Sequence, residues 1–91
     1  MDFEWDQAKS DVTYEQRGFD FAYAIQVFLD DRRLEREDTR RDYGERRYQA
    51  IGEIEGRFYF VVYARRDRRF RIISARRAHS HEDRAYRESK A

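Results

Sequence analysis

The chain has 91 residues, of which 43% are charged and 40% hydrophobic, and its formal net charge is +1. This size predicts one domain, residues 1–91, with one modest core, and the absence of cysteine excludes disulfides and thiolate-bound zinc. No apolar run approaches membrane-spanning length and the first residues lack the pattern of a signal peptide, so we expect a soluble, cytoplasmic protein that does not contact membranes.

Two short helices are predicted before residue 30. Asp6 is placed as the N-cap of the first helix, which ends at the basic Arg17, immediately before Gly18. Asp20 caps the second helix, whose apolar residues recur at helical spacing and so present one stripe to a core: Phe21, Ala24, Ile25 and Phe28.

Strands are predicted farther along the chain. Residues 30–47 alternate in charge and support at most a short edge strand near Leu34. Residues 48–55 and 57–64 flank Gly56 and are predicted to form a hairpin, because glycine favours the positive φ of a tight turn. The second strand of this hairpin is apolar on both faces, which is typical of a central strand.

The remaining elements complete the predicted fold. A charged turn leads to a third strand over residues 70–75. Ser80, three residues before Asp83, resembles a capping box and predicts a helix that ends near Glu88. The predicted fold class is α+β, with two N-terminal helices, a small antiparallel β-sheet of three to four strands and a short C-terminal helix.

The small net charge conceals an uneven distribution. Residues 1–45 carry 13 acidic and 7 basic side chains, whereas residues 46–91 carry 13 basic and 6 acidic ones. Eighteen of the 20 basic residues are arginine, whose planar fork of donors matches a phosphate bidentately. A clustered arginine surface would suit nucleic acid, but the blocks of opposite charge can also satisfy one another within the fold.

The third strand is expected to mount an arginine on the sheet. Alternation puts Arg71, Ile73 and Ala75 on one face, so Arg71 projects from a rigid element. Such an arginine can hold a scissile phosphate and stabilise the charge that grows on it in the transition state. Alternatively, Arg71 makes a cross-strand pair with Glu53 or Glu55.

Other charged residues lie near the predicted strands. Arg76 and Arg77 follow at the exit of the third strand, where neighbouring side chains reach opposite sides. Glu45 and Arg47 stand just before the first long strand, where they could serve as a proton acceptor and a phosphate ligand, or form a surface ion pair.

Other catalytic motifs are missing. The sequence has no Gly-rich phosphate loop, no nucleophile elbow and no histidine pair at helical metal spacing. His79 and His81 would need a third protein ligand that the sequence does not identify, so no metal and no other cofactor are predicted.

Several strings, in this order, make the chain resemble the BrnT family of bacterial toxins nearly end to end: Phe3-Glu-Trp-Asp6 with Lys9, Gly18 with Phe21, Asp42-Tyr-Gly-Glu45 with Arg47 and Tyr48, and Arg71-Ile-Ile-Ser-Ala-Arg76 with Arg77. This resemblance implies a RelE-like ribonuclease fold and an activity that cleaves RNA and halts translation. It also implies a hetero-oligomer with a DNA-binding BrnA antitoxin, so that operator DNA is contacted only through the antitoxin.

One segment departs from the family pattern. BrnT proteins usually have an asparagine and then a Lys-His pair directly before the glycine, where this chain has Thr13, Gln16 and Arg17. If that histidine takes part in proton transfer, catalysis is weaker here or its acid-base role belongs to Glu45, Tyr86 or Lys9. If it only contacts the helix end, Arg17 can replace it.

The first functional hypothesis is a metal-independent endoribonuclease in which the ribose 2′-hydroxyl attacks the adjacent phosphate. The residues expected to carry this reaction are Glu45 as base, Arg47, Arg71 and Arg76 as phosphate ligands, and Lys9 or Tyr86 as electrostatic or acid support. Arg77 is expected to bind RNA, and Tyr59 or Tyr63 to stack on a base if exposed.

The second hypothesis is a non-catalytic module that binds RNA or an antitoxin through a degenerate site. The two hypotheses differ in geometry. Convergence of Glu45, Arg71 and Arg76 within about 10 Å, a spread that one phosphate and its ribose could bridge, favours catalysis. Scattered positions favour the module.

Overall fold

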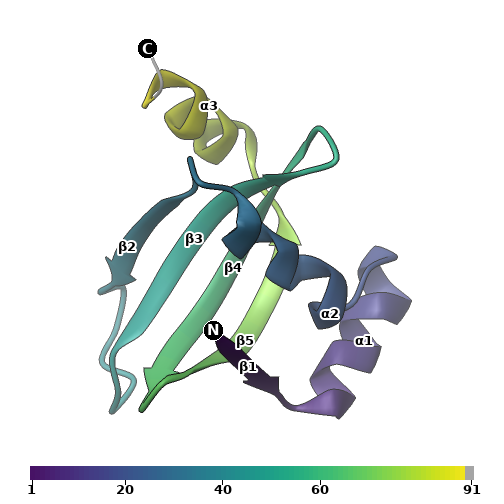
Figure 1. Ribbon diagram of the computed structural model, residues 1–91, viewed down its shortest axis with the longest axis vertical. Helices are drawn as coiled ribbons and strands as arrows, with labels where there is room; N and C mark the ends of the chain where they lie inside the picture. The colour runs from purple at the N-terminus through teal and green to yellow at the C-terminus, as the bar shows by residue number, and fades with distance from the viewer. Residues whose placement is uncertain (90–91) are drawn as a thin grey trace.

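The computed structural model describes residues 1–89 and has one five-stranded mixed sheet with helices on both faces (Figure 1). The strand order is β1-β5-β4-β3-β2, with β1 parallel to β5 and every other pair antiparallel. In chain order the elements are β1 (Asp2–Trp5), α1 (Gln7–Arg17), α2 (Phe21–Ala24), the 3₁₀ helix η1 (Ile25–Leu29), β2 (Leu34–Asp38), β3 (Arg47–Ile54), β4 (Arg57–Arg66), β5 (Arg69–Arg77) and α3 (Ser80–Glu88).

The predicted fold class is therefore wrong. The sheet has five strands rather than three to four, and it is mixed rather than antiparallel. The strand missing from the prediction is β1, which has only four residues and pairs with β5 from the far end of the sequence. A strand this short gives almost no alternation, and a parallel partner more than 60 residues away leaves no local turn to announce it.

The two predicted N-terminal caps are confirmed. Asp6 Oδ1 accepts hydrogen bonds from the backbone N–H groups of Ala8, at 2.9 Å, and Lys9, at 3.3 Å. Asp20 Oδ1 accepts from the Tyr23 N–H at 2.9 Å. The second helix is nevertheless shorter than expected, because it passes into η1 after Ala24.

The close approach of η1 to β3 depends on Gly52. A Cβ atom at this glycine would lie 2.7 Å from Val27 Cγ1 and 3.1 Å from the Val27 carbonyl oxygen. Val27 is fully buried. The missing side chain therefore lets η1 pack directly onto the sheet.

The predicted hairpin is confirmed as β3 and β4. Ile54 pairs with Arg57, which leaves Glu55 and Gly56 as a two-residue turn. Both turn residues have positive φ, 51° and 81°. This is the geometry of the tight hairpin turns that match the twist of the strands.

A β-bulge changes the alternation of β5. Val62 pairs with Ser74 and Tyr63 with Ile72, so Ile73 is an extra residue in the ladder. Ile73 packs against the cluster beneath α3, whereas Ala75 belongs to the main core. The prediction that Arg71, Ile73 and Ala75 share one face is wrong, because the bulge reverses the phase of the strand.

The sheet separates two apolar clusters. One face, which we call the helix face, packs against α2 and η1 through the larger cluster, which includes Phe21, Val27, Phe28, Val61 and Tyr63. The opposite face holds a smaller cluster under α3, formed by Ile51, Phe60, Val62 and Tyr86. Within residues 1–89, no helix combines the length and apolarity needed to cross a membrane.

The predicted helix after Ser80 is confirmed as α3, but its cap is not the one expected. His79 is the N-cap, and its N–H donates to Glu82 Oε1 at 2.8 Å. The Ser80 and Asp83 pair is shifted by one residue from these positions. The error arises because serine is a common N-cap, whereas here His79 and Glu82 form the capping box.

Candidate nucleic-acid interface

The sheet face opposite α2 and η1 carries arginines from four strands, and we call it the arginine face: Arg36 on β2, Arg47 on β3, Arg66 on β4, and Arg71 and Arg76 on β5. α3 covers only one end of this face, through the cluster around Phe60. The other end bears charged side chains that lie between about one-quarter and one-half exposed.

One row of residues crosses all five strands of the arginine face. In order, the register partners are Asp38, Arg47, Ala64, Arg71 and Glu4. Directly opposed residues point to the same face of a sheet, and the backbones of Arg47 and Arg71 are two strands, or roughly 10 Å, apart. Two arginines therefore flank a small central alanine, and each has a carboxylate on its outer side.

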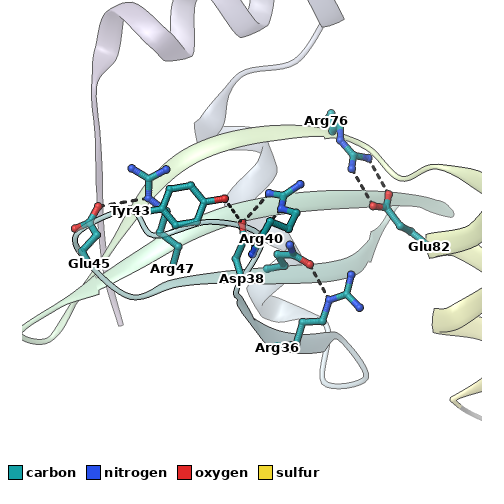
Figure 2. Close-up of polar contacts among 9 residues, drawn as sticks. Arg36, Asp38, Arg40, Tyr43, Glu45, Arg47, Arg76 and Glu82 are labelled. Atoms are coloured by element: carbon teal, nitrogen blue, oxygen red, sulfur yellow. Dashed lines mark hydrogen bonds and ion pairs between the residues drawn. The ribbon is translucent and has the colours of Figure 1, made fainter.

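The loop between β2 and β3 folds back onto this row through Asp38. Its side chain is fully buried and accepts two hydrogen bonds from the Arg40 guanidinium, at 2.8 and 2.7 Å. These bonds hold the pKa of the Asp38 carboxyl well below its usual range, against the opposing effect of burial. The Tyr43 hydroxyl donates to the same carboxylate at 3.3 Å, and the Tyr43 ring lies 4.2 Å from the Arg47 guanidinium carbon (Figure 2).

Glu45 lies between two arginines at the end of this loop. Its carboxylate accepts from Arg66 Nη2 at 3.1 Å and makes an ion pair with Arg47 Nε at 3.5 Å. Arg47 Nε is buried and has no hydrogen-bond partner among residues 1–89. The predicted neighbours Glu45 and Arg47 are thus in contact, and the Arg47 side chain remains 26% exposed.

Arg71 has a different partner from the two that the sequence suggested. Its Nη1 donates to Glu4 Oε2 at 2.9 Å, across the β1–β5 pair. Glu53 and Glu55 are wrong as partners because they lie at the other end of β3, beside the hairpin turn. The true partner is on the strand that sequence analysis missed.

Arg76 belongs to the other end of the arginine face. Its two Nη atoms donate to the two oxygens of Glu82, both at 2.8 Å, and its guanidinium lies 4.1 Å from the centre of the Phe60 ring. Phe60, its register partner, is four residues from Ala64 along β4, which is roughly 13 Å. Figure 2 shows this separation, with Arg76 and Glu82 at one end and Glu45 with Arg47 at the other.

The two supporting residues lie outside the row. Lys9 is exposed on α1 and lines a groove beside Ile73 and Ala75 at the β5 edge. Tyr86 is buried, and its hydroxyl donates to Asp30 Oδ2 at 2.6 Å. Burial and this hydrogen bond raise the pKa of Tyr86 to about 12. The hydrogen bond between Tyr86 and Asp30 holds α3 against the segment that precedes β2.

Tyr59 and Tyr63 were expected to stack on an RNA base only if exposed, and neither is exposed. Their exposed fractions are 4% and 0%, because both point into the core of the helix face. Arg77 lies over the Tyr59 ring and lines a cavity of about 390 Å³ together with Arg17 and Arg57. Position 17, where the family histidine is replaced, is thus beside Arg77 rather than Glu45.

The structure supplies the third group that a histidine metal site lacked. The nearest ligand atoms of His79, His81 and Glu82 all lie within 4.8 Å of one another. Arg76, however, already donates to both oxygens of Glu82. A metal ion would have to bind beside that positive charge or displace it, which disfavours metal binding by this cluster.

Sequence analysis missed Arg36, Arg66 and Glu4 as members of this surface. Each is exposed or half-exposed, and no local pattern marks any of them as part of a site. Only their register with neighbouring strands brings them to the arginine face. For Glu4, a strand could have been predicted from its alternation with Phe3 and Trp5, but this pattern is only four residues long.

Comparison with known proteins supports one family. Curated proteins give no match. The family model described as "Ribonuclease toxin, BrnT, of type II toxin-antitoxin system" matches residues 5–82, which include the last residue of β1, all of β2 to β5 and the first residues of α3. The chain therefore belongs to the BrnT family of ribonuclease toxins of type II toxin–antitoxin systems.

Proposed function

We propose that the chain is a metal-independent endoribonuclease that cleaves RNA in the cytoplasm and thereby inhibits translation. The observation that carries this proposal is the row in which Arg47 and Arg71 flank Ala64, with Glu45 in contact with Arg47. Attack by a 2′-hydroxyl needs a proton acceptor and cations around the same phosphate. This half of the arginine face offers both.

The positions of these side chains suggest the role of each in cleavage. A phosphate above Ala64 would lie between the guanidiniums of Arg47 and Arg71, which stabilise the extra negative charge of the transition state. Glu45 would take the 2′ proton, and Arg66 holds its carboxylate in place.

The ion pairs of the unliganded site do not oppose this function. Arg71 and Glu4 are each about one-third exposed, at 32% and 30%. Exposed pairs of this kind contribute only about 0–1 kcal/mol. A doubly charged transition state can therefore draw Arg71 away from Glu4 at little cost.

A second candidate is the non-catalytic module, and the position of Arg76 favours it. Arg76 and Glu45 are at opposite ends of the arginine face, so the three groups named from the sequence do not converge on one phosphate. In the catalytic proposal, Arg76 instead binds a neighbouring phosphate of the same strand. The two functions then differ in turnover and not in RNA binding.

The deciding experiment uses purified protein freed of antitoxin and incubated with RNA in excess EDTA. We expect cleavage that leaves a 2′,3′-cyclic phosphate, and no cleavage where the RNA carries a 2′-deoxyribose at the scissile position. A requirement for magnesium would contradict the mechanism. If the folded protein neither cuts RNA, with or without ribosomes, nor slows growth, the module takes its place.

The antitoxin is proposed to be a BrnA-like protein that also carries the DNA-binding function. The chain should then bind operator DNA only in its presence. A mobility-shift assay with toxin alone, antitoxin alone and the complex tests this proposal. Specific operator binding by the toxin alone would contradict it.

A further inference from the structure

A cavity of about 280 Å³ lies on the arginine face between the β2–β3 edge and α3. Leu34, Ile51 and Ala85 give it apolar walls. Its polar lining comes from both sides, with Glu35, Arg36 and Gln49 on the sheet and His81 and Glu82 on α3. A cavity with apolar walls and a few fixed polar groups, beside arginines that suit phosphates, is typical of a site for a nucleobase.

Arg36 presents a positioned fork to this cavity. Its Nε donates to Gln49 Oε1 at 2.7 Å, across the β2–β3 pair (Figure 2). This bond uses one of the five donors and leaves both Nη groups without a hydrogen-bond partner among residues 1–89. A fork held in this way matches two adjacent acceptors, and O6 and N7 of guanine are such a pair.

Glu82 presents an acceptor to the same cavity. Its Oε1 accepts from Arg76 Nη1 and from the His79 N–H, whereas Oε2 accepts one hydrogen bond among residues 1–89, from Arg76 Nη2, and lies 3.9 Å from His81 Nε2. Each carboxylate oxygen has two acceptor positions, so one remains on Oε2. That oxygen can accept from the N1–H of guanine, a proton that adenine does not have.

We propose that this cavity binds a guanine base of the RNA, with Arg36 donating to O6 and N7 and Glu82 Oε2 accepting from N1–H. The inference rests on the proposed RNA function of the arginine face and names the base that the site selects. Adenine fits both contacts badly, because its N6 amino group faces the Arg36 donors and its unprotonated N1 faces a carboxylate. Pyrimidines lack N7 altogether.

The test is an NMR titration of the purified chain with four purine 5′-monophosphates, which share the same phosphate. GMP and IMP should bind alike, because inosine keeps O6, N7 and N1–H. AMP should bind roughly five- to a hundredfold more weakly, the usual discrimination of one bidentate contact. 7-Deaza-GMP, which lacks one acceptor, should fall between them, and the shifted signals should include Leu34, Ile51 and Ala85.

Two variants separate a base contact from simple charge. Arg36→Lys keeps the charge but not the fork, so it should clearly reduce the preference for GMP over AMP, leaving the part that comes from Glu82, while binding AMP as the parent does. Arg84→Met removes an exposed arginine of α3 and should leave both affinities unchanged. Equal binding of GMP and AMP by the parent, or an unaltered preference in Arg36→Lys, overturns the proposal.

The guanine site and the ribonuclease activity can be tested separately. If the parent cuts RNA but Arg36→Lys keeps the same base preference in a cleavage map of a random RNA library, the guanine site is wrong and the ribonuclease stands. If the parent selects GMP in the titration yet never cuts RNA, the guanine site stands and the catalytic proposal fails.

Discussion

The two faces of the sheet use the same strands for opposite purposes. On the helix face the side chains are aromatic and buried, and Tyr63 packs against Phe28, Tyr48 and Phe70 within 5.0 to 5.6 Å between ring centres. On the arginine face the neighbouring residues in the same strands are charged and partly exposed. Because side chains alternate along a strand, a stable core and a polar site can share one short sequence.

In β5, a bulge interrupts the alternation of side chains between the two faces. Without the bulge at Ile73, Arg71 and Arg76 would point to opposite faces, because five residues separate them. With the bulge, Arg76 packs over Phe60 on the same face that carries Arg71. One extra residue therefore brings Arg71 and Arg76 to the same surface.

The largest expected effect concerns the helix face. Phe21→Ala should lower the free energy of unfolding by about 3–5 kcal/mol, because its ring is 99% buried and leaves a cavity. Leu29→Ala is the matched control, since Leu29 is 79% exposed and should change stability little. Denaturant titration measures both. Equal losses would show that the helix face is not the main core.

Substitutions on the arginine face should change the rate of RNA cleavage rather than the stability of the fold. Arg71→Ala should reduce RNA cleavage roughly 10²- to 10³-fold, the usual effect of removing one donor to the transition state. Its melting temperature should hardly change, since only an exposed ion pair to Glu4 is lost. Glu4→Gln is the control, because it removes the same pair and keeps Arg71. A parental rate in Arg71→Ala would refute the proposed site.

An intermediate effect is expected where η1 meets the sheet. Gly52→Ala should cost about 1–3 kcal/mol, the usual range for overpacking, because the new Cβ would lie 2.7 Å from Val27 Cγ1. In a double-mutant cycle with Val27→Ala, part of that cost should disappear. If the two substitutions are additive in thermal unfolding, the contact does not constrain η1.

Acid should weaken the loop that carries Tyr43 and Glu45. The pKa of Asp38 is lower in the folded chain than in the unfolded chain, so its stabilising effect is present above the ordinary carboxyl pKa near 4 and is lost as the pH falls further. Asp38→Asn should therefore flatten the loss of stability between about pH 4 and pH 2. Asp31→Asn, in an exposed turn, is the control and should leave the slope unchanged.

The smallest effect is expected at the departure from the family pattern. Arg17 ends α1, where a basic side chain suits the helix dipole, and it lies in the cavity with Arg77 rather than near Glu45. Arg17→His should thus leave the cleavage rate unchanged. A clear gain in rate would place proton transfer beside Arg77 and move the active site away from the Arg47–Arg71 row.

Local signals in the sequence determined a large part of this protein. The caps at Asp6 and Asp20 and the hairpin turn at Gly56 each depend on residues within a few positions, so the sequence predicted them correctly. The strings around Glu45 and Arg71 likewise identified the family before the fold was known. Each of these signals is short-range.

Only the tertiary structure decided how the charged residues combine. Glu4 meets Arg71 through a parallel pairing between the two ends of the chain, and no local pattern encodes such a contact. The bulge at Ile73 set which arginines share a face, and the packing of α3 brought Glu82 to Arg76. A site assembled across five strands depends on register, and register is settled by the whole core rather than by any one segment.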